Sequence, residues 1–369
     1  MDLTVIKTAI LNGASACNYL NVENIQKVND IYELTIFDKE TQKVFKTKAK
    51  FVVNATGPYT DGIRKMIDPS AQEICKPSTG IHLSMPKNMT DHNVGILINE
   101  SHNRVLFVLP WEGTTIVGTT DTPATIQERP LPTKKELESV LDRLSVIIDK
   151  NITTINNVKS CWSGIRPLVI DPNATKGDTA SISRSHLIQQ TGNFITISGG
   201  KWTIFRKMGK DVVDKISGTK SNDSEPDVEL KLYNCIDWTP QVTQQLIEKF
   251  KAPEDIAKHL SRSFGVEALD IANIRGGFNR LHPEYPYTEE ELIHICKNEY
   301  VCSLEDIISR RTRLAFIDVP ATIEILDKVS NIVKSELKWS DNKVQIELEK
   351  CKKFLNEDMG YDLLRVKTQ

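Results

Sequence analysis

One stretch, Ile182 to Val213, constrains the fold of this 369-residue chain more than any other. Ser183 to Ile188 is a strand candidate, Thr191 to Asn193 has turn residues, and Phe194 to Ile197 is β-branched and aromatic, so together they predict a hairpin. The pair Gly199-Gly200 follows, where a helix is expected to begin. Glycines at such a corner leave backbone N–H groups open to a ligand, and the helix dipole favours negative charge there.

A helix is predicted after the glycine pair, because Ile204, Met208, Val212 and Val213 have the spacing of a buried stripe. Lys201 lies in the junction between the strand and this helix. The residues alone allow two interpretations of the junction: an anion-binding corner, or a plain strand-to-helix turn with an exposed lysine.

Composition excludes several classes of protein. Hydrophobic residues make up 39% and charged residues 26% of the chain, as in ordinary globular proteins. The formal net charge is -2, so no global basicity indicates nucleic acid binding. No apolar run is long enough to span a bilayer, and the first residues lack the layout of a targeting segment. The seven cysteines form no CxxC pair and no zinc-type cluster, which predicts reduced thiols and no metal site.

The first part of the chain mixes one helix with strands. A helix is predicted over residues 2–12, a strand over 16–22, and a hairpin from Tyr32 to Phe37 and Val44 to Thr47. The apolar run Phe51 to Asn54 then ends in Ala55-Thr56-Gly57. Such a run is typical of a buried parallel strand whose carboxyl end meets a ligand or a close-packed helix, and plain core is the alternative.

Short strands dominate the next part. We expect a mostly antiparallel sheet, because turn residues separate four β-like stretches at short spacing. These are 81–85, 94–98, 105–109 and 114–118. A capped helix is predicted from Lys134 to Ile148.

The pattern changes to helices beyond a small, polar segment that begins near Gly218. Seven segments with helical periodicity follow: 239–250, 253–264, 267–274, 288–299, 303–310, 322–337 and 341–355. The sequence therefore predicts three parts: an α/β part over residues 1–217, a linker over 218–230, and an all-helical part over 231–369.

Two arginines and a histidine are candidate binding and acid–base residues. Arg166 lies among glycine, proline and apolar residues, and Arg184 lies on the predicted hairpin. An arginine held stiffly in this way suits a phosphate or carboxylate, and a structural ion pair is the alternative. His82 follows Gly80-Ile81 on a predicted strand, where it is either a satisfied core residue or an acid–base group.

Seven motifs, in order along nearly the whole chain, resemble the FAD-dependent glycerol-3-phosphate dehydrogenases. They are NATGPYTD (54–61), STGIHLSMP (78–86), LPWEGTTIVGTTDTP (109–123), SGIRPLV (163–169), SRSH (183–186), SGGKWTIFRKM (198–208) and NEYVCSLEDIISRRTRLAF (298–316). Seven collinear matches are far more specific than any one of them.

The resemblance implies an α/β plus α fold: a partial FAD-binding, Rossmann-like domain with an antiparallel substrate sheet, followed by a helical domain. It implies that FAD contacts two segments, Ala55, Thr56 and Gly57, and Gly199, Gly200, Lys201 and Thr203. Arg166 and Arg184 would bind the substrate phosphate. His82 and Lys201 are the two candidates for accepting the proton of the substrate hydroxyl.

The activity implied by the resemblance is oxidation of sn-glycerol 3-phosphate to dihydroxyacetone phosphate, with FAD as hydride acceptor and a quinone as onward acceptor. Peripheral contact with an inner membrane of a mitochondrion or related organelle is implied in the same way. Two rivals stay open: a non-catalytic fragment that acts as a folded remnant or interaction module, and a flavin oxidase of amines or amino acids. The second rival explains neither Arg166 nor the RRTRLAF segment.

The sequence departs from the family's pattern at its start. No GxGxxG occurs, so the unit that binds the ADP part of FAD is missing and we expect an N-terminally truncated chain with an unpaired sheet edge. The tail contains no DxDxDG loop, so calcium regulation is not expected.

Overall fold

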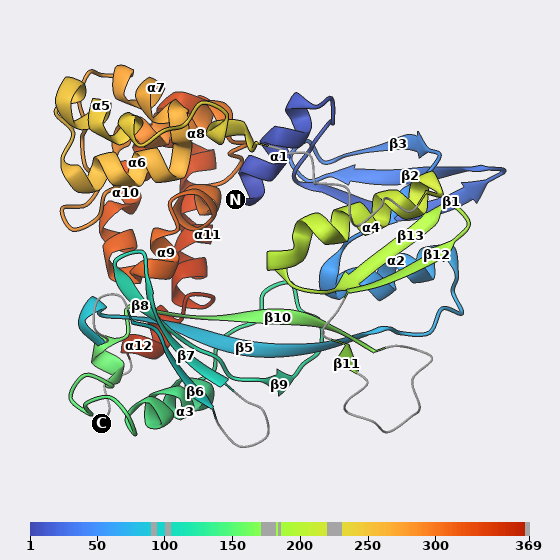
Figure 1. Cartoon of the computed structure of the whole chain (residues 1–369), viewed down its shortest axis with the longest axis horizontal. Coiled ribbons are helices and arrows are strands. Elements are labelled where there is room, and N and C mark those ends of the chain that lie inside the picture. Colours follow the sequence, from blue (N-terminus) through green and yellow to red (C-terminus); the bar gives the residue numbers. More distant parts are fainter. Residues whose placement is uncertain (90–93, 100–104, 171–181, 184–185, 220–230, 366–369) are drawn as a thin grey trace.

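The computed structural model describes residues 1–89, 94–99, 105–170, 182–183, 186–219 and 231–365. Its strands form three sheets, and the helices of residues 241–356 gather at one end, while the other helices lie beside the sheets or near the N-terminus (Figure 1). The fold class expected from the sequence, α/β followed by α, is confirmed.

Residues 1–67 and 186–217 together form two three-stranded sheets and the helices next to them. After helix α1 (Asp2–Leu11), strands β1 (Leu20–Val28), β2 (Ile31–Asp38) and β3 (Lys43–Ala49) form an antiparallel meander. β4 (Val52–Asn54) runs parallel to β13 (Phe194–Gly199), which pairs antiparallel with β12 (His186–Thr191). Helices α2 (Thr60–Ile67) and α4 (Phe205–Ser217) contact this second sheet. The expected hairpins and the expected parallel strand are therefore present. The first strand of the second hairpin begins at His186, and Ser183, expected in the same strand, pairs with Val169 in the large sheet instead.

The large antiparallel sheet has the order β11-β10-β5-β8-β7-β6, with β9 paired to β5. Its strands are β5 (Cys75–Met85), β6 (Ile96–Asn99), β7 (Val105–Trp111), β8 (Thr114–Gly118), β9 (Thr122–Pro123), β10 (Ser160–Ile170) and β11 (Ile182–Ser183). One face packs on helix α3 (Lys134–Leu144), where side chains such as Ile81, Leu83 and Val117 form a fully buried core with Leu137. The helical region covers one end of the other face, where Ser84 and Ser160 are fully buried.

The helical region buries the largest core of the molecule. It contains α5 (Gln241–Phe250), α6 (Glu254–Phe264), α7 (Ala268–Asn273), α8 (Glu289–Asn298), α9 (Leu314–Ile317), α10 (Val319–Leu337), α11 (Asp341–Asn356) and α12 (Tyr361–Arg365). Thr288 and Glu291 form a capping box that starts α8. Helix α12 also contacts the large sheet, because its side chains Leu363 and Leu364 pack against the core of that sheet.

Several predicted bounds were wrong. The strand expected over residues 16–22 is β1, which begins at Leu20 and continues to Val28 because it pairs with β2 along that whole length. The helix expected over 303–310 is a π-helix from Asp306 to Arg311. Val213 is 59% exposed, so the buried stripe of α4 contains Val212 and Met208 but not Val213. The long strand β10 was not predicted.

Candidate functional site

One face of the large sheet carries the predicted residues. Successive side chains in a strand point to opposite faces, so residues of β5 two apart share a face. Ile81 and Leu83 face the core, and Ser78, Gly80, His82 and Ser84 therefore face the opposite side. In the register with β10, these four residues stand opposite Arg166, Gly164, Trp162 and Ser160. His82 and Arg166 thus share one face, with a pair of glycines between them.

The guanidinium of Arg166 is folded back over Gly80. A Cβ placed on Gly80 would lie 2.4 Å from Arg166 Nη2 and 2.2 Å from the carbonyl oxygen of Thr120. Arg166 therefore requires glycine at position 80, and its charge lies two residues along β5 from His82. By contrast, a Cβ on Gly164 would meet no atom of the described residues within 4 Å, so these residues leave the space over Gly164 open.

Four contacts hold the Arg166 side chain in this position. Nη1 donates to the carbonyl of Thr79 and forms an ion pair with Asp121, both at 3.3 Å. Nη2 donates to Thr119 Oγ1 at 2.6 Å and to the carbonyl of Thr120 at 3.1 Å. Asp121 is half exposed, so its pairing is screened by water and leaves the cation available to an anionic ligand.

His82 lies between an aromatic ring and bare backbone. Trp162 stacks on its imidazole with ring centroids 5.8 Å apart and ring planes inclined by 19°. On its other side, a Cβ on Gly118 of β8 would lie 2.5 Å from His82 Cδ2. Burial, and secondarily the charge of Arg166, lower the pKa of His82 to about 4. The imidazole is therefore neutral at neutral pH and can accept a proton.

The helical region supports this face directly. Ser84 Oγ donates to the carbonyl of Ile317 at 2.7 Å, and Ser160 Oγ donates to the carbonyl of Phe316; both serines are fully buried. Phe316 also meets Trp162 edge to face, with ring centroids 5.2 Å apart. Helix α9 thus fixes the end of the β5–β10 pair next to His82 and Trp162.

The predicted flavin segment after β4 is held by Asn54, which is 2% exposed. Its Nδ2 donates to the carbonyl of Thr60 at 2.9 Å, and its Oδ1 accepts from Thr56 Oγ1 at 2.7 Å. Gly57 follows with φ +57°, a conformation that glycine adopts readily. The turn of residues 57–59 contacts both β5 and β10, so this segment lies against the large sheet.

The glycine corner has the geometry expected of it. Gly199 and Gly200 have φ values of +74° and +76°, and a Cβ on Gly200 would lie 2.8 Å from Met208 Sδ. A short 3-10 turn over residues 202–204 follows, and no side chain of the described residues caps its start. Its first N–H groups therefore lack intrahelical acceptors. Lys201 and Thr203 are exposed. Strand β13, which ends at this corner, contacts β10 of the large sheet.

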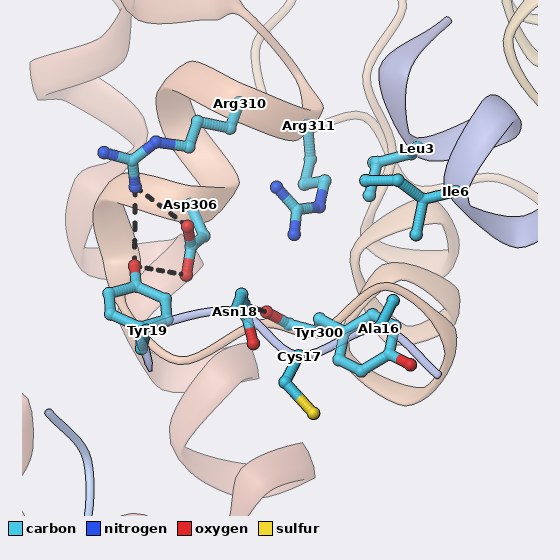
Figure 2. Close-up of a pocket in the computed structure, with 10 residues that line it drawn as sticks. All are labelled: Leu3, Ile6, Ala16, Cys17, Asn18, Tyr19, Tyr300, Asp306, Arg310 and Arg311. Carbon is cyan, nitrogen blue, oxygen red and sulfur yellow. Dashed lines mark hydrogen bonds and ion pairs between the residues drawn. The ribbon is translucent and has the colours of Figure 1, made fainter. Parts of the chain in front are cut away.

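Two cavities lie elsewhere, between α1 and the helical region. One has a volume of about 340 Å³ and is shown in Figure 2, where Tyr19, Asp306 and Arg310 form a hydrogen-bonded group at one end. The other has a volume of about 940 Å³ and shares Leu3, Arg310 and Arg311 with it. Neither is lined by His82, Arg166 or Lys201, so neither coincides with the predicted site.

The structure brings the predicted residues together only in part. His82 and Arg166 share one face, and the Ala55–Gly57 segment leads into a turn that contacts the same sheet. Gly199, Gly200, Lys201 and Thr203 form the corner after β13. Arg184 lies outside the described residues. Sequence reasoning missed Trp162 and gave no role to Gly164 and Ser78, although these two lie in the SGIRPLV and STGIHLSMP motifs. The Oγ of Ser78 is buried without a partner among the described residues. The strand register places all three residues next to His82 and Arg166.

Comparisons with known proteins define the class. Residues 3–209 match the family model of the FAD dependent oxidoreductases, and residues 215–344 match that of the C-terminal domain of alpha-glycerophosphate oxidase. The first match covers more than half of the chain, which therefore belongs to the FAD-dependent oxidoreductase family.

Within that family, its sequence is similar to the glycerol-3-phosphate dehydrogenases. It is 37% identical over 381 residues to the mitochondrial enzyme of Macaca fascicularis, covering 98% of this chain and 52% of that protein. It is 38% identical over 378 residues to the probable mitochondrial enzyme of Dictyostelium discoideum, covering 96% and 59%. The chain thus spans about half the length of the curated relatives it matches.

A solved structure shares the fold. The glycerol-3-phosphate dehydrogenase of Bacillus halodurans, complexed with FAD, superposes with a TM-score of 0.78 at 22% identity, covering 96% of this chain and 72% of that one. The described residues include no group of three or more potential metal ligands and no helix that could cross a membrane.

The residues present fit a flavin ring. Two consecutive glycines with positive φ precede an uncapped helix start, so backbone N–H groups are open to the polar edge of a ligand. Ala55, Thr56 and Gly57 follow the carboxyl end of parallel β4, where α/β sheets bind their ligands.

Proposed function

We propose that this chain oxidises sn-glycerol 3-phosphate to dihydroxyacetone phosphate, with FAD as the hydride acceptor. The observation that carries the proposal is the placement of Arg166 and His82 on one sheet face, with the guanidinium over Gly80. A cation next to a neutral imidazole suits a substrate with a phosphate at one end and a secondary alcohol nearby. In glycerol 3-phosphate, only the ester oxygen and one carbon separate the phosphorus from the carbon that carries the secondary hydroxyl. The family model and the relatives support the same reaction.

Each group has a task in this proposal. Arg166 binds the phosphate by charge and by hydrogen bonds, and Asp121 holds its guanidinium in place. His82 or Lys201 accepts the hydroxyl proton while the C2 hydride leaves. FAD, when bound by Ala55 to Gly57 and by Gly199, Gly200, Lys201 and Thr203, takes up that hydride. His82 has the geometric advantage, because it lies on the same face as Arg166.

Phosphate binding also prepares His82 for its role. The charge of Arg166 contributes to the low pKa of His82. A bound phosphate dianion neutralises that charge, so the imidazole becomes more basic when substrate is present. The base is thereby strengthened at the moment when the proton has to be removed.

Steady-state turnover with an artificial electron acceptor tests the proposal. Arg166→Gln is expected to raise KM for glycerol 3-phosphate about 100-fold, since a charge-assisted contact to phosphate is lost. His82→Gln is expected to lower kcat by about 10²–10⁴-fold with little change in KM. A wild-type protein that holds flavin but does not oxidise glycerol 3-phosphate would refute the proposal and favour a non-catalytic role.

We also propose a quinone as the onward acceptor and a mitochondrial or mitochondrion-related location with peripheral membrane contact. The support is the similarity to relatives named as mitochondrial enzymes. Fractionation of cells that express the chain, with and without a carbonate wash, tests the location. Reduction of a short-chain quinone by the purified protein tests the acceptor.

A further inference from the structure

Gly80 and Gly164, which have no side chains, lie on the face that carries the proposed site. The two glycines stand directly opposite each other in the β5–β10 register. On one side of this pair stand His82 and Trp162, and on the other stand Ser78 and Arg166. Cross-strand neighbours on one face lie about 5 Å apart. The bare backbone therefore lies between the imidazole and the side chain that carries the cation.

The two glycines are not equivalent. Gly80 is covered, because the guanidinium of Arg166 and the Thr120 carbonyl oxygen occupy the space of its Cβ. Gly164 is exposed, and its Cβ would meet no atom of the described residues within 4 Å. Packing within the chain thus explains glycine at position 80 and does not explain it at position 164. Backbone geometry does not require glycine there either, since its φ lies outside the left-handed region.

We propose that Gly164 is a specificity-determining residue. The carbon chain of a small phosphorylated polyol packs against its bare backbone, between Arg166 and His82. The inference rests on the proposed function and names the residue that sets substrate size. A methyl group at this position would fill the space that the carbon chain needs. It would touch no atom of the described residues within 4 Å.

The test is calorimetric titration of glycerol 3-phosphate and of inorganic phosphate into three proteins: wild type, Gly164→Ala and Gly209→Ala. Gly209 is the matched control, because its Cβ also meets nothing within 4 Å and it lies on the exposed side of α4. Thermal unfolding of each protein confirms the fold. We expect Gly164→Ala to weaken glycerol 3-phosphate binding at least tenfold. Inorganic phosphate has no carbon chain to place over Gly164, so it should bind within twofold of wild type.

The outcomes separate the two proposals. If wild type binds glycerol 3-phosphate and Gly164→Ala binds it within twofold, the role of Gly164 is refuted while the proposed function stands. Equal weakening of phosphate and glycerol 3-phosphate would also refute it, because the methyl group would then be disturbing Arg166. If wild type binds neither ligand, the proposed function itself fails.

Discussion

Trp162 stacks on the imidazole of His82 across the β5–β10 pair, with ring planes inclined by 19°. The indole covers one face of the imidazole and is itself held by the edge of Phe316 from α9. A buried imidazole resists protonation because the charged form loses hydration. Through this stack, the helical region helps to bury His82 on the large sheet.

Removal of the indole should therefore change the titration of His82. We expect Trp162→Leu to raise the pKa of His82 from about 4 toward its ordinary value of 6.5. The Cε1 proton of His82, followed by NMR from pH 3 to 8, measures the change. Trp238→Phe, in a tryptophan that donates to Ser261 in the helical region, is the control and should leave the titration unchanged. An unaltered His82 titration in Trp162→Leu would contradict the account.

The pH dependence of stability follows from the same residue. The pKa of His82 is about 4 in the folded protein and ordinarily 6.5, so the unfolded chain takes up the proton first as pH falls. The free energy of unfolding should fall between pH 6.5 and 4, with a contribution from His82 of about 3 kcal/mol. Urea unfolding at pH 7 and pH 4 measures it. His82→Gln should lose less stability over this range than wild type, and an equal loss would refute the assignment.

The turn after β4 depends on Asn54 as both donor and acceptor. Asn54→Asp removes the donor to the Thr60 carbonyl and places a buried carboxylate beside it. We expect a loss of about 3 kcal/mol in the free energy of unfolding, and less flavin in the purified protein. Chemical denaturation and the visible absorbance measure the two effects. Asn151→Asp, on an exposed loop, should change stability by less than about 0.5 kcal/mol.

The glycine corner provides a matched pair of substitutions. Gly200→Ala combines a φ of +76° with a contact of 2.8 Å to Met208 Sδ, so we expect a loss of about 1–2 kcal/mol. Gly209→Ala lies within α4 in open space and should gain about 0.5–1 kcal/mol, because alanine is the better helix former. Thermal unfolding distinguishes the two. Equal effects would mean that the corner is not strained.

Local signals in the sequence predict much of this fold. The β12–β13 hairpin follows from its turn residues, α3 from its cap at Thr133, and the strand before Ala55 from its short apolar run. Strand β10 was missed because Gly164 and Pro167 interrupt its pattern, and both residue types are depleted in strands. Its long pairing with β5 stabilises it nonetheless.

Individual residues of the site could be predicted from the sequence, but their arrangement could not. His82 and Arg166 each stand out by residue type and neighbours, but their shared face depends on a register between strands about 80 residues apart. Trp162 has no local signal of function, and Gly164 and Ser78 stand out only as members of two of the seven motifs. Their relation to His82 and Arg166 arises from the pairing itself, which sequence periodicity does not specify.

The visible spectrum of the purified chain under anaerobic conditions tests the central claim most directly. We predict that the protein carries oxidised flavin, that glycerol 3-phosphate bleaches it, and that glycerol without phosphate does not. Arg166→Gln should keep its flavin and resist bleaching at the same substrate concentration. A flavin that stays oxidised in wild type with saturating glycerol 3-phosphate, or a natively purified chain without flavin, would contradict the account.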